Sequence, residues 1–115
     1  MIFRQLFDST SGTYSYLLAS RRGGEALLVD PVREQMPAYL QLLTELDVRL
    51  VHALDTHTHA DHVTALGALR DATQCRTVMG EFSRADCVDH YLSDDETLDV
   101  DGIRLRAIYT PGHTN

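Results

Sequence analysis

Short apolar segments separated by turn-forming residues occupy the start of the chain. Residues 2–7 (IFRQLF) and 13–20 (TYSYLLAS) contain the aromatic and β-branched side chains that are typical of strands. The residues RRGG at 21–24 connect the second segment to EALLVD at 25–30, and their glycines favour a tight hairpin turn. We therefore expect two or three antiparallel strands in this region.

The next segment, REQMPAYLQLLTELD at 33–47, has the spacing of an amphipathic helix. Met36, Leu40 and Leu43 recur at helical intervals, and Leu46 extends the same predicted apolar face. Pro37 is compatible with this helix only in its first turn, where the absence of an N–H group is tolerated. We expect a helix of about ten residues.

A buried strand and a second helix follow. RLVHALD at 49–55 has the length and apolar content of a buried strand, and VTALGALRDA at 63–72 places Val63, Leu66 and Leu69 on one helical face. The residues between these two segments therefore lie at a strand-to-helix junction.

The remaining segments predict further strands. CRTVMG at 75–80 is a short strand, and SRADCVDH at 83–90 is a helical turn or loop. TLDVDGIRLRAIYT at 97–110 is a hairpin, because Asp101-Gly102 suits a type I′ turn. Strands alternating with helices, with antiparallel hairpins at both ends, indicate an α+β (mixed α/β) fold in which helices pack on a mixed sheet.

Length and charge narrow the class of protein. With 115 residues the chain is predicted to form one domain, 1–115, that buries roughly two-thirds of its unfolded surface. The 10 basic and 17 acidic side chains give a net charge of −7, which argues against nucleic acid or an anionic membrane as a partner. The absence of a long apolar run, of a secretory signal and of a C-x-x-C motif predicts a cytoplasmic protein with reduced thiols.

The candidate chemistry is concentrated in DTHTHADHV at 55–63, which holds three of the six histidines. In an extended loop, side chains at alternate positions point the same way, so His57 and His59 can reach one metal ion. Asp61 is expected to continue this alternation, and His62 to begin the helix, where it can face a neighbouring metal position. The alternative is a polar loop that caps the helix through Thr58 or Asp61, but capping leaves three histidines unexplained.

A second contribution to the same site is expected from YTPGHT at 109–114, where Pro111-Gly112 bends the chain and presents His113. Imidazole and carboxylate ligands without thiolate suit zinc, iron or manganese and disfavour Cu(I). His52, inside an apolar run, is predicted to be a packed strand residue, and His90 a solvent-facing loop residue, so neither is a candidate ligand.

The H-x-H-x-D-H pattern at 57–62 and the later TPGHT resemble the metallo-β-lactamase superfamily. Within it, the segments IFRQLFDSTSGTYSYLLA, LLVDPV, ELDVRLVHALDTHTHADHVT and IRLRAIYTPGHT resemble the persulfide dioxygenases related to glyoxalase II. The resemblance runs along essentially the whole chain. It implies a four-layer αββα sandwich of which residues 1–115 supply roughly the first half, with a metal at the edge where the two sheets meet.

The resemblance also implies roles for individual residues. His57 and His113 match the two histidines that hold the iron of persulfide dioxygenases, and His59 matches the third histidine of the first metal position in zinc-dependent relatives. Asp61 and His62 match the second metal position, and Asp61 is the candidate catalytic residue. Family members continue beyond the position of Asn115 for about as long again, and that half is expected to carry the remaining metal ligands and most glutathione-binding groups.

Three functions are compatible with this resemblance. The first is an Fe(2+)-dependent dioxygenase that oxidises glutathione persulfide, or a related thiol substrate, to sulfite with O₂. The second is a glyoxalase II-like thioester hydrolase with Zn(2+), one or two ions, in which Asp61 and His62 bind metal directly. The third is a catalytically inactive metal-binding chain. Because half of a two-sheet sandwich exposes an apolar face, we expect a homodimer or association with the other half.

Overall fold

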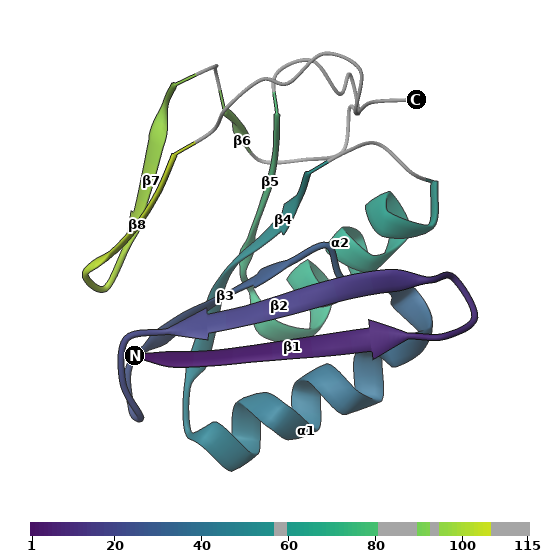
Figure 1. Ribbon diagram of the computed structural model, residues 1–115, viewed down its shortest axis with the longest axis horizontal. Coiled ribbons are helices and arrows are strands. Elements are labelled where there is room, and N and C mark those ends of the chain that lie inside the picture. The colour runs from purple at the N-terminus through teal and green to yellow at the C-terminus, as the bar shows by residue number, and fades with distance from the viewer. Residues whose placement is uncertain (57–59, 81–89, 93–94, 107–115) are drawn as a thin grey trace.

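The computed structural model describes residues 1–56, 60–80, 90–92 and 95–106, and its elements follow the predicted order (Figure 1). They are β1 (Ile2–Asp8), β2 (Thr13–Ala19), β3 (Glu25–Val29), the 3₁₀ turn η1 (Arg33–Gln35), α1 (Met36–Leu46), β4 (Arg49–Asp55), α2 (Ala60–Thr73), β5 (Arg76–Gly80), β6 (His90–Leu92), β7 (Thr97–Val100) and β8 (Ile103–Arg106). Strands β1 to β6 form one sheet in sequence order, and β7 and β8 form a separate hairpin. The pairs β1–β2 and β2–β3 are antiparallel, and the pairs from β3 to β6 are parallel, which confirms a mixed sheet.

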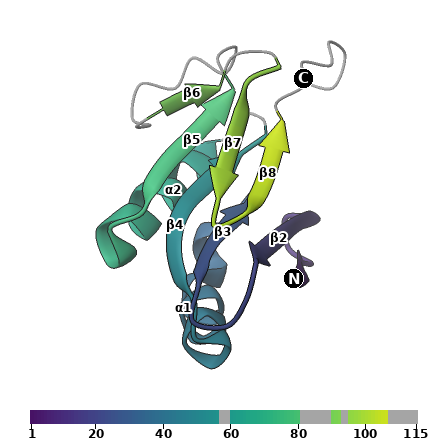
Figure 2. The same ribbon diagram turned by 90° about the vertical axis from the view of Figure 1, so that its left-hand side faces the viewer.

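The central strands of the sheet are buried on both faces. Successive residues of a strand point to opposite faces, so Leu28 and Met79 pack against α1 and α2, whereas Leu27 and Val78 pack against Val100 of β7. Figure 2 shows the β7–β8 hairpin on one side of the sheet and the two helices on the other. The described residues thus form three layers, with helices, the main sheet and a hairpin of a second sheet.

Helix α1 differs from its prediction in the residue that faces the core. Leu40 is 37% exposed, whereas Tyr39 is 1% exposed and packs with Leu43 and Leu46. Positions 39, 43 and 46 fall on one helical stripe, and Leu40 lies about 100° further round the helix. Pro37 lies in the first turn as predicted.

Helix α2 begins at Ala60, two positions before His62, where the sequence predicted its start. Leu66 and Leu69 are buried, which confirms the predicted apolar face, and the side chain of Val63 lies outside the described residues. Neither α1 nor α2, the α-helices that the structure describes, combines the length and apolar character needed to cross a bilayer.

The carboxyl-terminal third of the described chain contains the β7–β8 hairpin and the short strand β6. Asp101 and Gly102 have φ angles of 48° and 89°, the two positive values that the predicted type I′ turn requires. The prediction of a loop at His90 is wrong, because this residue begins β6 and pairs with Val78 of β5. The backbone hydrogen bonds that His90 gains by pairing with β5 at the edge of the sheet outweigh the preference of this polar segment for a loop. Residues 83–89, the rest of the predicted loop, lie outside the described residues.

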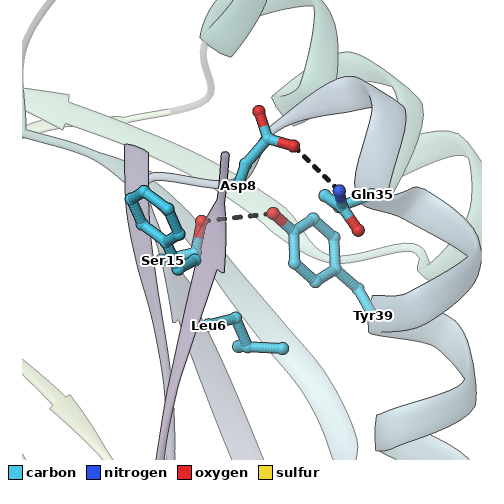
Figure 3. A pocket seen from close by; sticks show the side chains of 6 residues that line it. Leu6, Asp8, Ser15, Gln35 and Tyr39 are labelled. Carbon is cyan, nitrogen blue, oxygen red and sulfur yellow. Dashed lines mark hydrogen bonds between the residues drawn. The ribbon is translucent and has the colours of Figure 1, made fainter. Parts of the chain in front are cut away.

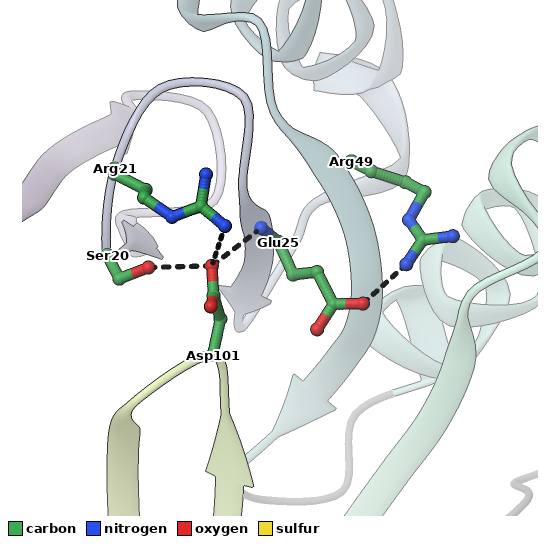
Figure 4. A network of polar contacts seen from close by, with 5 residues as sticks. All are labelled: Ser20, Arg21, Glu25, Arg49 and Asp101. Atoms are coloured by element: carbon green, nitrogen blue, oxygen red, sulfur yellow. Dashed lines mark hydrogen bonds and ion pairs between the residues drawn. The ribbon is translucent and has the colours of Figure 1, made fainter.

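The turn of the β7–β8 hairpin is fastened to the β2–β3 turn by one carboxylate (Figure 4). Asp101 Oδ2 accepts hydrogen bonds from Ser20 Oγ at 2.7 Å and from the Glu25 backbone N–H at 3.3 Å, and Arg21 Nη2 lies 3.8 Å away. The bond from Ser20, the Glu25 N–H and the Arg21 charge together lower the pKa of Asp101. The contribution of this contact to stability is therefore present near neutral pH and is lost only as the pH falls below about 4.

Gly24 leaves the space that this contact needs. A Cβ at position 24 would lie 2.5 Å from Asp101 Oδ2, whereas a Cβ at Gly67 in α2 would meet nothing within 4 Å. We expect Gly24→Ala to lower the free energy of unfolding by about 1–3 kcal/mol through overpacking. Gly67→Ala, the matched control, should raise it by up to about 1 kcal/mol, because alanine favours helix. Urea unfolding of both variants measures the two effects, and equal effects would show that the hairpin does not rest on the β2–β3 turn.

Candidate functional site

The predicted metal-binding motif lies at the edge of the sheet where the parallel strands end. Strands β3 to β6 run in the same direction, so their carboxyl ends meet at one edge. Strand β4 ends at Asp55 and α2 begins at Ala60, which confirms a strand-to-helix junction for the motif at 57–62. Ligands commonly bind at this edge in sheets of this kind.

The structure places only part of the predicted site. His57, His59 and His113 lie outside the described residues. The backbone of Asp61 and His62 belongs to the first turn of α2, and their side chains lie outside the described residues. The extended alternation predicted for Asp61 is therefore wrong, since the chain is already helical at this position. An acidic residue is favourable there, because the amino terminus of a helix carries partial positive charge.

Among the residues whose side chains the structure describes, no group of three or more His, Cys, Asp or Glu could hold a metal ion. The convergence of His57 and His113 on one metal stays a prediction. The structure does describe the residues immediately before His57 and the hydrogen bonds that hold them.

Asp30 holds the residue that precedes His57. The Asp30 Oδ1 accepts a hydrogen bond from the Thr56 backbone N–H at 2.7 Å, and Oδ2 accepts one from Thr56 Oγ1 at 2.7 Å. The Asp30 N–H donates to the Leu54 carbonyl at 2.7 Å. Asp30 is 7% exposed and has a left-handed φ of 54°. One buried residue after β3 therefore fixes both the end of β4 and the start of the motif.

A line of hydrogen bonds joins Asp30 to helix α1. Ser15 Oγ donates to the Asp30 carbonyl at 2.6 Å, and it lies 3.1 Å from Tyr39 Oη, which accepts from the Val32 N–H at 2.8 Å. The single hydroxyl proton of Ser15 is used on Asp30, so Tyr39 donates to Ser15. Figure 3 shows these two hydroxyl groups facing each other. The direction of every proton in this line is thus determined.

Asp55, the last residue of β4, is 4% exposed and comes two residues before His57 in the chain. Burial, and secondarily the charge of Asp30, raise the pKa of Asp55 to about 8. At neutral pH, Asp55 is therefore mostly protonated. The two neighbouring aspartates therefore differ in role, since Asp30 accepts both hydrogen bonds from Thr56 and burial disfavours the charged form of Asp55.

The Tyr39 hydroxyl can be removed without changing the shape of the core. We expect Tyr39→Phe to lower the free energy of unfolding by about 1–3 kcal/mol, because it leaves the buried Val32 N–H without its acceptor. Tyr14→Phe is the matched control, since Tyr14 is 50% exposed, and it should change stability by less than about 0.5 kcal/mol. Chemical denaturation at neutral pH distinguishes the two. A Tyr39→Phe variant as stable as the control would show that the line of hydrogen bonds contributes nothing.

Sequence reasoning missed the supporting residues Asp30, Thr56, Ser15 and Tyr39. Two signals were present in the sequence. Asp30 stands between a buried strand and Pro31, and Tyr39 has helical spacing to Leu43 and Leu46. Neither signal identifies a partner, because Asp30 and Thr56 are 26 positions apart.

Comparison with known proteins identifies the family of this chain. Residues 9–115 match the Metallo-beta-lactamase superfamily. The chain is 39% identical over 115 residues to the mitochondrial persulfide dioxygenase ETHE1 of Homo sapiens, and the match covers 99% of this chain and 45% of that protein. It is 35% identical over 111 residues to a probable hydroxyacylglutathione hydrolase of Schizosaccharomyces pombe, covering 95% of this chain and 43% of that protein.

A solved structure supports the same relationship. The crystal structure of ETHE1 from Myxococcus xanthus matches with a TM-score of 0.84 and 45% sequence identity, over 92% of this chain and 47% of that chain. The predicted fold class and the predicted family resemblance are confirmed. The chain spans just under half the length of these relatives.

Proposed function

Because the chain belongs to the metallo-beta-lactamase superfamily, we propose that it contributes the H-x-H-x-D-H part of the metal site of a persulfide dioxygenase. In the proposed reaction the terminal sulfur of glutathione persulfide is oxidised by O₂ and water to sulfite, and glutathione is released. The observation that carries the proposal is the 39% identity to a persulfide dioxygenase along 99% of this chain.

The donor set fits a divalent metal ion. His57 and His113 would hold Fe(2+), together with a carboxylate from the part of the family's domain that these residues do not span. Imidazole and carboxylate ligands suit iron and zinc alike. When bound, such an iron supplies open coordination positions at which sulfur and O₂ can meet.

The described residues would serve this site by holding the backbone at both ends of the motif in a fixed orientation. Asp30 holds Thr56 through two hydrogen bonds, so the peptide unit between Asp55 and Thr56, one residue before His57, has a fixed direction. The first turn of α2 holds the backbone of Asp61 and His62 at the other end of the motif. A metal site requires this kind of support, because small displacements of its ligands weaken binding.

A glyoxalase II-like hydrolase is the second candidate, and the identity of 35% to a probable hydroxyacylglutathione hydrolase favours it. In this case Zn(2+) would lower the pKa of a bound water, and Asp61 and His62 would be direct ligands of a second ion. The two candidates therefore differ in the role of these two residues.

Metal analysis of protein purified without oxygen separates the candidates. One iron per chain, with sulfite formed from glutathione persulfide, would support the dioxygenase. Two zinc ions per chain, with hydrolysis of a glutathione thioester, would support the hydrolase. Metal bound without either activity would favour the third prediction, an inactive metal-binding chain.

The β1–β2 hairpin exposes an aromatic face that bears on the association of this chain with other chains. Phe3 and Phe7, which are 49% and 54% exposed, lie beside Tyr16 and Tyr14 on one face of the β1–β2 hairpin. We propose that this aromatic face supports the expected homodimer or association with the rest of the domain. We also propose that the protein is cytoplasmic. Size-exclusion chromatography that shows a monomer at high protein concentration would contradict the homodimer.

A further inference from the structure

A pocket outside the metal-binding motif lies between the β1–β2 hairpin and the start of α1 (Figure 3). Its volume is about 160 Å³, and its lining comes from Leu6, Phe7, Asp8, Ser15, Gln35 and Tyr39. The Asp8 carboxylate lies at one end and the Leu6 side chain at the other. The pocket therefore combines a charged end with an apolar wall.

Asp8 is a buried charge without a counter-charge in the described structure. It is 7% exposed, and none of the ion pairs within 4.0 Å among the described residues includes it. Hydrogen bonds from the Ser11 hydroxyl, the Gln35 amide and the Ser11 N–H lower its pKa, so the carboxylate is ionised at neutral pH. Buried carboxylates in proteins are usually paired with a cation.

The Gln35 amide already donates to Asp8 Oδ1 at 2.8 Å, and the two hydroxyl groups of the pocket, on Ser15 and Tyr39, can accept further hydrogen bonds but have no free proton to donate. The Ser15 hydroxyl proton is used on the Asp30 carbonyl, and the Tyr39 hydroxyl proton is used on Ser15. Both hydroxyl oxygens and the carboxylate oxygens keep lone pairs. A ligand that complements this surface carries positive charge and several N–H donors.

We propose that this pocket binds the primary ammonium group of a small organic molecule, with the ammonium at Asp8 and a short alkyl part against Leu6. An alkylammonium ion has three N–H donors for the carboxylate and its neighbours and an apolar tail for the wall. A bare metal ion fits less well, because part of the lining is apolar. The net charge of −7 on the chain favours the approach of any cation.

Hydrogen bonds connect the pocket to the residue that precedes His57. Ser15 lines the pocket and donates to the carbonyl of Asp30, and the carboxylate of Asp30 holds Thr56. A ligand that contacts Ser15 or Tyr39 therefore acts on the same residue that fixes the start of the motif. The binding itself does not depend on the proposed dioxygenase activity.

Titration with n-propylammonium chloride, followed by the backbone amide signals in NMR, tests the proposal. We expect saturable shifts at residues 7–11, 15 and 35, with a dissociation constant on the order of 1 mM, since four non-hydrogen atoms limit the affinity. Equal concentrations of n-propanol, tetramethylammonium chloride and sodium chloride should bind at least about tenfold more weakly, because each lacks the charge, the N–H donors or the tail.

Two variants with the same charge change complete the test. Asp8→Asn should weaken n-propylammonium binding by about tenfold or more, whereas Asp99→Asn, at an exposed residue paired with Arg104, should leave it unchanged. If Asp8→Asn does not fold, the comparison of the four ligands on the unaltered chain still decides. Shifts spread over the acidic surface, or equal binding of tetramethylammonium or sodium, would overturn the proposal.

Discussion

Replacing His57 by alanine is expected to abolish retention of the metal, with affinity reduced by more than about a hundredfold. The loss of an outer hydrogen-bond partner alone weakens metal sites by about 10–100-fold, and the loss of a direct ligand should exceed that. His62→Ala should reduce the binding of one ion by less than about tenfold, because His62 matches a position that a mononuclear site leaves empty. Competition with a chromophoric chelator measures both affinities.

The control for these two variants is His52→Ala. His52 lies within β4, opposite Leu27 and Arg76, and three residues before the end of the strand at Asp55. Its replacement changes one imidazole outside the motif and should leave metal affinity unchanged. Equal loss of metal in His57→Ala and His62→Ala would contradict a mononuclear site and favour the two-zinc hydrolase.

Asp30→Ala is expected to lower the free energy of unfolding by about 3–5 kcal/mol. The change removes two hydrogen bonds that Thr56 donates to the Asp30 carboxylate, each worth about 1.5–3 kcal/mol, and places alanine at a left-handed φ. Loss of Asp30 also removes one of the two causes that raise the pKa of Asp55, which offsets part of this loss. Asp30→Asn keeps an acceptor and tolerates the backbone conformation, so its effect should be smaller.

Asp47→Ala is the control that measures how much of the loss in unfolding free energy comes from the left-handed backbone and how much from the hydrogen bonds. Asp47 ends α1 with a φ of 55°, close to the value of 54° at Asp30, but it is exposed. The control should therefore lose only about 1–2 kcal/mol, the value associated with the left-handed conformation. Urea unfolding monitored by circular dichroism gives both values. If Asp30→Ala destabilises the chain no more than Asp47→Ala, the contact with Thr56 does not hold the start of the motif.

The pattern of residues along the chain determined the local structure. Helical spacing around Leu43 and Leu46 predicted α1, Pro37 located its first turn, and Asp101-Gly102 predicted the type I′ turn between β7 and β8. These features depend on residues within a few positions of one another, so a sequence contains all that is needed to predict them. The candidate metal ligands at 57–62 are also close together in the chain, so the sequence alone is enough to propose them.

Only the tertiary structure decided which distant polar groups meet. Asp30 and Thr56 are 26 positions apart, Ser15 and Tyr39 are 24 apart, and Ser20 and Asp101 are 81 apart. Each of these contacts depends on the order of strands in the sheet and on the side of the sheet that α1 and the β7–β8 hairpin cover. His90 shows the same limit, since pairing with β5 made it a strand residue in a polar segment. Hydrogen bonding between strands depends on neighbours in space, which local spacing does not specify.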